Sequence, residues 1–561
     1  MGGPLEAGVL REGSEALERA EWEAARSAFA AVLEDGDSAE ARDGLAQATW
    51  FLGSVTEAIA LREQAFEDYV RTGRCDDAVR VAVWVSHQHM LTGRVSAARG
   101  WLARSERALE GLPDCAGHGW VAVERARQAT SVHEQIAHAT RALEVGRAMG
   151  QSDLDVLAVS VLGRAQVDAG RREDGLRLLE EAMAAATSGR VHNVHTLAEA
   201  YCNLILACRD AGEWELATEW CEHVDTFARS HATAPLYGAC RTVHADVLMA
   251  NGHWAEADYA LQMALATHAR YIPQMSAPTI ASLAELRVHQ GRLPEAEELL
   301  AGREEHPAAL RALALLRMAD GRPRQALTLL ERGLRSTGDN AVAAAQFLMP
   351  IVEARLALGD VAGARSAADE LARLADSTRI RLLAARAHLA RAQAVLGAEE
   401  AAEAVEPARR ALTAFSVLLM PLDAGLARLA LARALLDDDP ETAREEARTA
   451  LHAFRELGAS RAADTAAALL REFGEAQGGR PRVVGELTAR EQEVLGLISL
   501  GMSNAGIAHT LVISERTAGH HVSHILDKLG VRNRAEAAAY AARAGARDGS
   551  AGRPRSDTGG G

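Results

Sequence analysis

One short pattern recurs along most of this 561-residue chain. Gly212 to Ala217 reads Gly-Glu-Trp-Glu-Leu-Ala, and Gly252 to Ala257 reads Gly-His-Trp-Ala-Glu-Ala. Looser copies begin at Gly53, Gly93, Gly291, Gly321 and Gly359, and Ala20 replaces the glycine before Trp22. A second small residue often follows the alanine by seven positions, as in Ala58 and Ala65. With this second position as the mark, copies fall near residues 32, 65, 105, 142, 182, 224, 264, 303, 333, 371, 411 and 450.

Each part of the pattern has a mechanical role in a pair of helices. Glycine takes the left-handed conformation that ends one helix, and the aromatic residue two positions later packs the turn. Small residues seven apart lie on one helix face, where a neighbouring helix can approach closely. The chain is therefore predicted to repeat a helix-turn-helix pair about twelve times over roughly residues 20–470. Val81 to Val85 has a strand-like composition, but its place between two repeat turns predicts helix.

This turn resembles that of the tetratricopeptide family, although the spacing, mostly 37–42 residues, exceeds the 34 of that family. A HEAT-like array remains possible on spacing alone. Such arrays stack into a superhelix whose concave groove binds peptides or other ligands. We therefore expect a protein or small-molecule effector in the groove.

Composition and charge exclude several classes of protein. No run of 18 apolar residues lacks a charge, and no basic region precedes an apolar stretch at the start. The six cysteines are scattered without a CxxC pair, as in a reduced cytoplasmic protein. We expect a cytoplasmic protein with no membrane partner. The net charge is −16, but residues 480–561 hold 11 basic against 8 acidic residues, so only this end is suited to a polyanion.

No catalytic, cofactor or metal site is predicted. The one lysine, Lys528, precedes Leu529, so no GxxxxGK[ST] phosphate-binding loop is present. His133 and His138 resemble a zinc-protease motif but are five residues apart, which places them on different helix faces. No serine-histidine-aspartate or paired-carboxylate arrangement stands out. We therefore expect a protein that is not an enzyme.

The helical pattern stops after Phe473, and residues 474–486 contain the Gly478-Gly479 pair and Pro481, which favour a flexible linker. Thr488 and Glu491 then form a capping box. Four helices are predicted, and the second is capped by Ser503. Their buried faces hold Val494, Leu495, Leu497 and Ile498, then Ile507, Ala508 and Leu511, then Val522, Ile525, Leu526 and Leu529. A short helix, a tight turn and a longer helix match the geometry that places one helix in the DNA major groove.

Residues 487–545 resemble the LuxR-type DNA-binding domain, on matches that include Leu487-Thr488, Gly501 to Asn504, Ile507-Ala508 and Lys528 to Val531. Together with the repeats, they make the chain similar to large LuxR-type regulators, although no ATPase module is seen. The resemblance implies an all-α protein that binds double-stranded promoter DNA and regulates transcription. The DNA-binding residues that it implies are Ser503, Asn504, Ser514, Arg516, Thr517, Gly519, His520, Ser523, His524 and Lys528. Ser503 and Asn504 would face phosphate through exposed amides, and Gly519, His520 and Ser523 would face bases.

Two glycines depart from the family pattern. Gly519 stands where members of the family often carry a basic residue, and Gly506 lies in the second helix. Glycine inside a helix costs roughly 1 kcal/mol relative to alanine. An alternative function is therefore a protein-interaction scaffold with a degenerate DNA-binding domain.

The predicted organisation is a repeat array over 1–473, a linker over 474–486, a helix-turn-helix domain over 487–545 and a disordered tail over 546–561. The resemblance also implies a homodimer on DNA, with the fourth helix, about 534–544, at the contact. Its alanine-rich face holds Ala535, Ala538, Ala539 and Ala542.

Overall fold

The structure, a computed structural model, describes residues 4–230, 234–473 and 489–511. Beyond these it describes residues 518–519, 522, 525–526, 529, 531, 534, 536–538 and 540–541. The chain divides into two compact units, Met1–Leu469 and Leu470–Gly561, and each is described by itself. The described residues contain no β-strand, so the predicted all-α class is confirmed.

In the described part of the first unit, twelve antiparallel helix pairs are followed by one more helix. The first helices of the pairs are α1 (Pro4–Glu18), α3 (Ala39–Phe51), α5 (Cys75–Leu91), α7 (Ala116–Gln128), α9 (Ser152–Asp168), α11 (Val194–Ala211), α13 (Ala234–Ala250), α15 (Ser276–His289), α17 (Leu310–Ala319), α19 (Ala341–Ala357), α21 (Arg381–Leu396) and α23 (Pro421–Ala434). Their partners are α2 (Trp22–Asp35), α4 (Val55–Arg71), α6 (Val95–Ala108), α8 (Val132–Ala148), α10 (Arg172–Ala185), α12 (Trp214–Ser230), α14 (Trp254–Tyr271), α16 (Leu293–Leu300), α18 (Pro323–Ser336), α20 (Val361–Thr378), α22 (Ala401–Val417) and α24 (Pro440–Leu457), and α25 (Ser460–Glu472) follows. The predicted tetratricopeptide-like array is confirmed, and residues 81–85 are helical.

The repeat turns have the backbone geometry that the pattern predicts. Gly53, Gly93, Gly212, Gly252, Gly291, Gly321 and Gly359 all have positive φ, and Ala20 takes the same region at φ 57°. The residue after the glycine then closes the turn, as where the amide of His253 donates to the carbonyl of Leu248 at 2.8 Å. This bond satisfies a carbonyl at the end of the first helix, so that the next helix can begin at once.

The small residues of the pattern lie where helices pack. Ala58, Ala65, Ala257 and Ala264 are completely buried, and so are most of their equivalents. The copy expected near residue 303 is present as α15 and α16, but its second position falls outside the helix, because α16 has only eight residues and ends at Leu300. Gly302 takes a positive φ of 73° there and turns the chain early.

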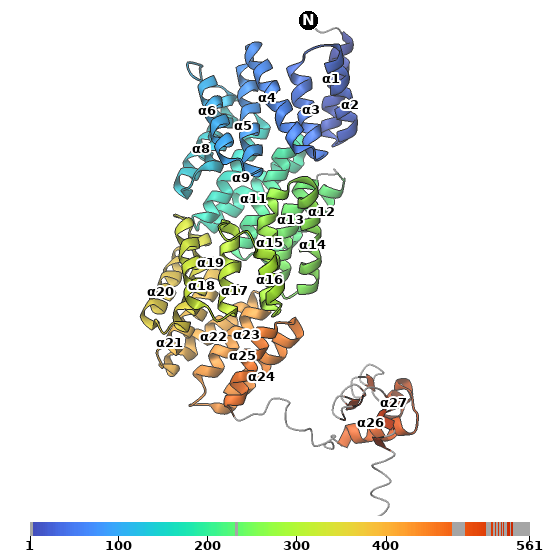
Figure 1. Ribbon diagram of the computed structural model, residues 1–561, viewed down its shortest axis with the longest axis vertical. Helices are drawn as coiled ribbons and strands as arrows, with labels where there is room; N and C mark the ends of the chain where they lie inside the picture. The colour runs from blue at the N-terminus through green and yellow to red at the C-terminus, as the bar shows by residue number, and fades with distance from the viewer. Residues whose placement is uncertain are drawn as a thin grey trace, which may run out of the picture. The chain divides into compact units, whose positions relative to one another are not determined.

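The helix pairs wind into a superhelix within the first unit. In Figure 1, α1–α3 and α12–α14 lie on one side, whereas α6, α8 and α18–α20 lie on the other. We call each full turn of the superhelix a coil, and successive coils touch one another. The carboxylate of Asp339 accepts hydrogen bonds from the amide of Val132 at 2.7 Å, the amide of His133 at 3.2 Å and the hydroxyl of Ser131 at 2.9 Å. It thus caps α8 from more than 200 residues away.

Further contacts between coils use the repeat turns themselves. A Cβ atom placed on Gly212 would lie 2.8 Å from Leu382, and one on Gly252 would lie 2.7 Å from both Leu457 and Pro421. Glycine is therefore favoured at these two turns for two reasons. Its φ is positive, and the next coil leaves no room for a Cβ atom.

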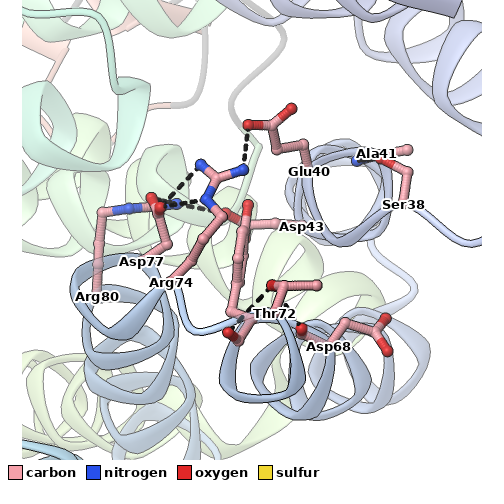
Figure 2. Close-up of polar contacts among 10 residues, drawn as sticks. Ser38, Glu40, Ala41, Asp43, Asp68, Thr72, Arg74, Asp77 and Arg80 are labelled. Atoms are coloured by element: carbon pink, nitrogen blue, oxygen red, sulfur yellow. Dashed lines mark hydrogen bonds and ion pairs between the residues drawn. The ribbon is translucent and has the colours of Figure 1, made fainter. Parts of the chain in front are cut away.

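Ion pairs join neighbouring helix pairs at the start of the array. Arg74, in the turn before α5, binds Glu40 of α3 and Asp77 of α5, as Figure 2 shows. Arg80 binds Asp43 at 2.9 Å. The two arginines therefore fix α5 against α3.

Candidate functional site

The second unit contains the predicted DNA-binding segment, which begins with α26 (Ala489–Ser499). Just after this helix, Gly501 has a φ of 77°, and the amide of Met502 donates to the carbonyl of Leu497 at 3.2 Å. Val494 and Ile498, four residues apart, are buried on one face. The glycine therefore turns the chain sharply towards the next helix.

The next helix, α27 (Asn504–Leu511), begins as the sequence predicts. The hydroxyl of Ser503 accepts a hydrogen bond from the amide of Gly506 at 3.2 Å, so Ser503 is confirmed as the cap. The N-terminus of a helix carries partial positive charge and exposed amides, which suit a phosphate.

A compact apolar core joins these helices to the segments that follow. The buried members are Val494, Leu495, Ile498, Ile507, Ala508, Ala518, Val522, Ile525, Leu529 and Ala537. Leu497, Leu511 and Leu526 are partly buried against them, so each predicted buried face is confirmed. Ala518 was not predicted, although it lies four residues before Val522 and so shares its helix face.

The structure describes three of the ten predicted DNA-binding residues. Ser503 is exposed, whereas Asn504 and Gly519 are half-buried. Gly519 and Asn504 lie close together, since a Cβ atom on Gly519 would lie 3.6 Å from the side-chain nitrogen of Asn504. The other seven lie outside the described residues: Ser514, Arg516, Thr517, His520, Ser523, His524 and Lys528.

Arg534 makes contacts that the sequence pattern did not indicate. Its guanidinium donates to the side-chain oxygen of Asn504 at 3.0 Å and to the carbonyl of Met502. These residues are about 30 positions apart, and no local motif links them. Arg534 thus holds the start of α27 in place.

The predicted dimer face is described at one of its four alanines. Ala538 is partly buried against the domain core, beside the fully buried Ala537, whereas Glu536 is exposed. Ala535, Ala539 and Ala542 lie outside the described residues.

The array holds the second candidate site, a cavity of about 990 Å³. Its wall comes mainly from the first helices of the pairs, from α11 to α23, and from α25. Charged residues on this wall include Asp246, Arg311, Glu353 and Arg386. The cavity is therefore an interior space of the superhelix with both charged and apolar groups on its wall, and an effector was predicted in the groove of the array.

Two further findings concern only the described part of the chain. No helix there is long and apolar enough to cross a membrane. No group of three or more histidine, cysteine, aspartate or glutamate side chains there is arranged to hold a metal ion.

Fold and site together define a helical-repeat array joined to a small helical domain of the helix-turn-helix class. Residues 485–541, about a tenth of the chain, match the family described as "Bacterial regulatory proteins, luxR family".

Similar proteins share this domain. The transcriptional regulatory protein LnrK of Bacillus subtilis (strain 168) is 46% identical over 66 residues, 12% of this chain and 30% of that protein. The nitrate/nitrite response regulator protein NarL of Escherichia coli (strain K12) is 44% identical over 59 residues, 10% of this chain and 27% of NarL. The chain therefore spans less than a third of the length of each of these two curated relatives.

Solved structures also resemble the chain. The APC/C hetero-tetramer Cut9-Hcn1 matches at 13% identity and a TM-score of 0.45, over 82% of this chain and 96% of that one. The Rap protein complexed with competence and sporulation factor matches at 13% identity and a TM-score of 0.44, over 66% of this chain and 99% of that one.

Proposed function

We propose that this chain is a DNA-binding transcriptional regulator. The observation that carries the proposal is the match of residues 485–541 to the luxR family, on a segment whose described residues form an apolar core. Relatives over this segment are named as transcriptional regulators. A degenerate domain in a scaffold would not need a capped α27 beside a preserved third-helix core, so the scaffold is the less supported alternative.

In this proposal, α27 lies across the DNA backbone and the third helix enters the major groove. Ser503 and Asn504 approach a phosphate through the first amides of α27. Gly519, His520 and Ser523 face the bases. Polar and cationic contacts come from Ser514, Arg516, Thr517, His524 and Lys528.

The proposed regulator acts as a homodimer on DNA, joined through residues of about 534–544. It is cytoplasmic and performs no catalysis. Its array binds a protein or small-molecule effector, and the interior cavity supports this role because it is roomy and lined with both polar and apolar groups. The proposed boundaries are array 1–473, linker 474–486, DNA-binding domain 487–545 and tail 546–561.

The test is binding of the full chain to DNA from its own upstream region, followed by fluorescence anisotropy at several salt concentrations. A regulator is expected to bind this duplex more tightly than a scrambled duplex of the same composition. Equal binding to both, or binding to neither, would favour the scaffold. Sedimentation of the protein–DNA complex then distinguishes one copy from two.

A further inference from the structure

Charged residues line the interior of the superhelix, and those from α7 to α17 are paired. Arg127 of α7 binds Glu199 of α11 at 2.8 Å. Arg164 of α9 binds Asp210 of α11 at 2.6 Å, and Arg209 binds Asp246 of α13 at 3.0 Å. The last of these pairs joins Arg311 of α17 to Glu285 of α15. Each arginine thus links its own helix to another inner helix.

These pairs stabilise the charged forms of most of their members. Burial opposes the charge on Asp210, but Arg209 and Arg164 outweigh it and hold the pKa of this carboxyl below its ordinary value. Burial likewise opposes the charge on Arg127, but Glu199 and Glu124 raise the pKa of its guanidinium. A paired interior charge is therefore compensated.

The ion pairing does not extend to four charged residues on the cavity wall. Glu353 of α19, Arg386 of α21, Asp423 of α23 and Arg461 of α25 all line the cavity. None of the four has an ion pair within 4.0 Å among the described residues. The first three are half-buried and Arg461 is exposed. Two negative and two positive groups therefore face one space without an ion pair, and Glu353 has Gln393 as a hydrogen-bonding neighbour.

The pKa values of these four groups shift against the charged form, although each has an opposite charge nearby that offsets part of the effect of burial. Burial raises the pKa of the Glu353 and Asp423 carboxyls, and it lowers the pKa of the Arg386 and Arg461 guanidiniums. Arg386 offsets the effect on Asp423 only in part. An ion pair does not always keep a buried carboxyl below its ordinary pKa. Burial raises the pKa of Glu285 although Arg311 acts in the opposite direction.

The rest of the cavity wall is suited to an organic molecule. The volume of about 990 Å³ lies at the upper end of the usual range for ligand sites, roughly 300–1,000 Å³. Apolar side chains between the charges include Phe347, Met349, Leu389 and Met420. Burial lowers the pKa of His289, also on the wall, to about 4, so its ring is a neutral hydrogen-bonding group.

We propose that this cavity binds a small amphoteric molecule, one that carries a protonated amine and a carboxylate on an apolar body. The amine lies against Glu353 and Asp423, and the carboxylate lies against Arg386 and Arg461. Amino acids and short peptides with free termini have this chemistry. The proposal deepens the proposed effector-binding role of the array and rests on it for its regulatory meaning, though not for binding itself.

The test uses the purified full chain and a pooled library of tripeptides with free termini, together with the free amino acids. Thermal shift identifies binding members, and titration calorimetry measures their affinity. We expect at least one member to raise the unfolding temperature. Acetylating its amine or amidating its carboxylate should each weaken binding at least tenfold, because each removes one charge.

The decisive variants remove a charge and keep the shape. Asp423→Asn should weaken binding at least tenfold and leave the unfolding temperature of the free protein unchanged or higher, since a charge that is only partly compensated is lost. Arg386→Gln tests the opposite charge in the same way. The control is Asp369→Asn, at an exposed position of α20, which should bind like the parent.

Three outcomes would overturn the proposal: no member of the library binds, capped peptides bind as well as free ones, or Asp423→Asn and Arg386→Gln bind like the parent. A pool of neutral oligosaccharides serves as a comparison, and stronger binding of that pool would also overturn it. DNA binding is measured separately. Ligand binding without any change in DNA affinity would leave this site intact and refute the proposed sensing role instead.

Discussion

The guanidinium of Arg534 and the side-chain oxygen of Asn504 are joined by a hydrogen bond of 3.0 Å. Arg534 also donates to the carbonyl of Met502, between α26 and α27. A cation that the composition alone would assign to DNA phosphate is therefore engaged within the domain. The number of cations left for phosphate is small, which predicts a shallow dependence of DNA affinity on salt.

Replacing Arg534 should destabilise the domain. Arg534→Ala removes two hydrogen bonds made by a charged donor, each contributing roughly 1.5–3 kcal/mol. Arg534→Lys keeps the charge but cannot reproduce both bonds of the planar guanidinium. Both variants should lower the unfolding temperature of the second unit, measured by calorimetry on the full chain. Wild-type stability of Arg534→Lys, with an unchanged salt slope, would show that only the charge at this position matters.

Gly519 is a position where a basic residue should strengthen DNA binding. A side chain fits there as far as the described residues show, because among them its Cβ atom would meet only Asn504, at an ordinary contact distance of 3.6 Å. Gly519→Lys should steepen the slope of log K against log salt by about 0.9 through one added phosphate contact. The matched control is Gly519→Ala, which gains helix propensity alone.

Anisotropy titrations on duplex DNA measure both Gly519 variants. Equal slopes for Gly519→Lys and Gly519→Ala, in proteins that are both folded, would show that the third helix does not face DNA.

His289 should make the stability of the array fall in mild acid. Burial, with Arg311 and Arg461 nearby, lowers its pKa in the folded protein to about 4, whereas the unfolded value is about 6.5. The folded state therefore holds fewer protons than the unfolded state between these values. The stability contribution is present above about pH 6.5 and is lost as the pH falls towards 4.

Urea unfolding near pH 8 and near pH 5 measures this loss. His289→Gln should lose less stability than the parent over that interval, and His133→Gln, at an exposed position of α8, should behave like the parent. The same loss in all three proteins would rule out His289 as its source.

Asp339 should couple two coils of the array. Its carboxylate caps α8 from another coil, and the amide of Val132 holds its pKa below the ordinary value. Asp339→Ala should cost about 1 kcal/mol, as for other helix caps. Asp360→Ala is the matched control, because Asp360 caps its own helix, α20, through the amide of Gly363 at 2.9 Å.

Both substitutions remove a cap, but only Asp339→Ala should broaden the unfolding transition. Hydrogen exchange should then show α8 opening independently of α19. Equal broadening in Asp360→Ala would show that the link between coils has no special role.

The sequence predicts the local geometry because local chemistry determines it. A glycine before Trp254 sets the turn, and Ala257 sets the closeness of the helices. The core of the second unit follows for the same reason, from the spacing of residues such as Val522 and Ile525.

Contacts between distant residues could not be predicted in this way. Asp339 and Val132 lie in different repeats, and the periodic pattern is the same whether or not the coils touch. The sequence also does not predict which interior charges form ion pairs, because Arg311 and Arg386 have similar neighbours in the sequence. Only the superhelical path places Arg311 in an ion pair with a carboxylate and leaves Arg386 on the cavity wall without one among the described residues.

The contacts between coils also bear on how quickly a molecule can exchange with the interior. In many repeat proteins each repeat contacts only its neighbours in sequence, so successive turns of the superhelix can separate from one another. Here the turns at Gly212 and Gly252 lie against the following coil, and Asp339 fastens another coil at α8. Lateral entry would require these contacts to break. We therefore expect a ligand to enter and leave along the axis of the superhelix and to dissociate slowly. The site would then stay occupied through a brief fall in ligand concentration.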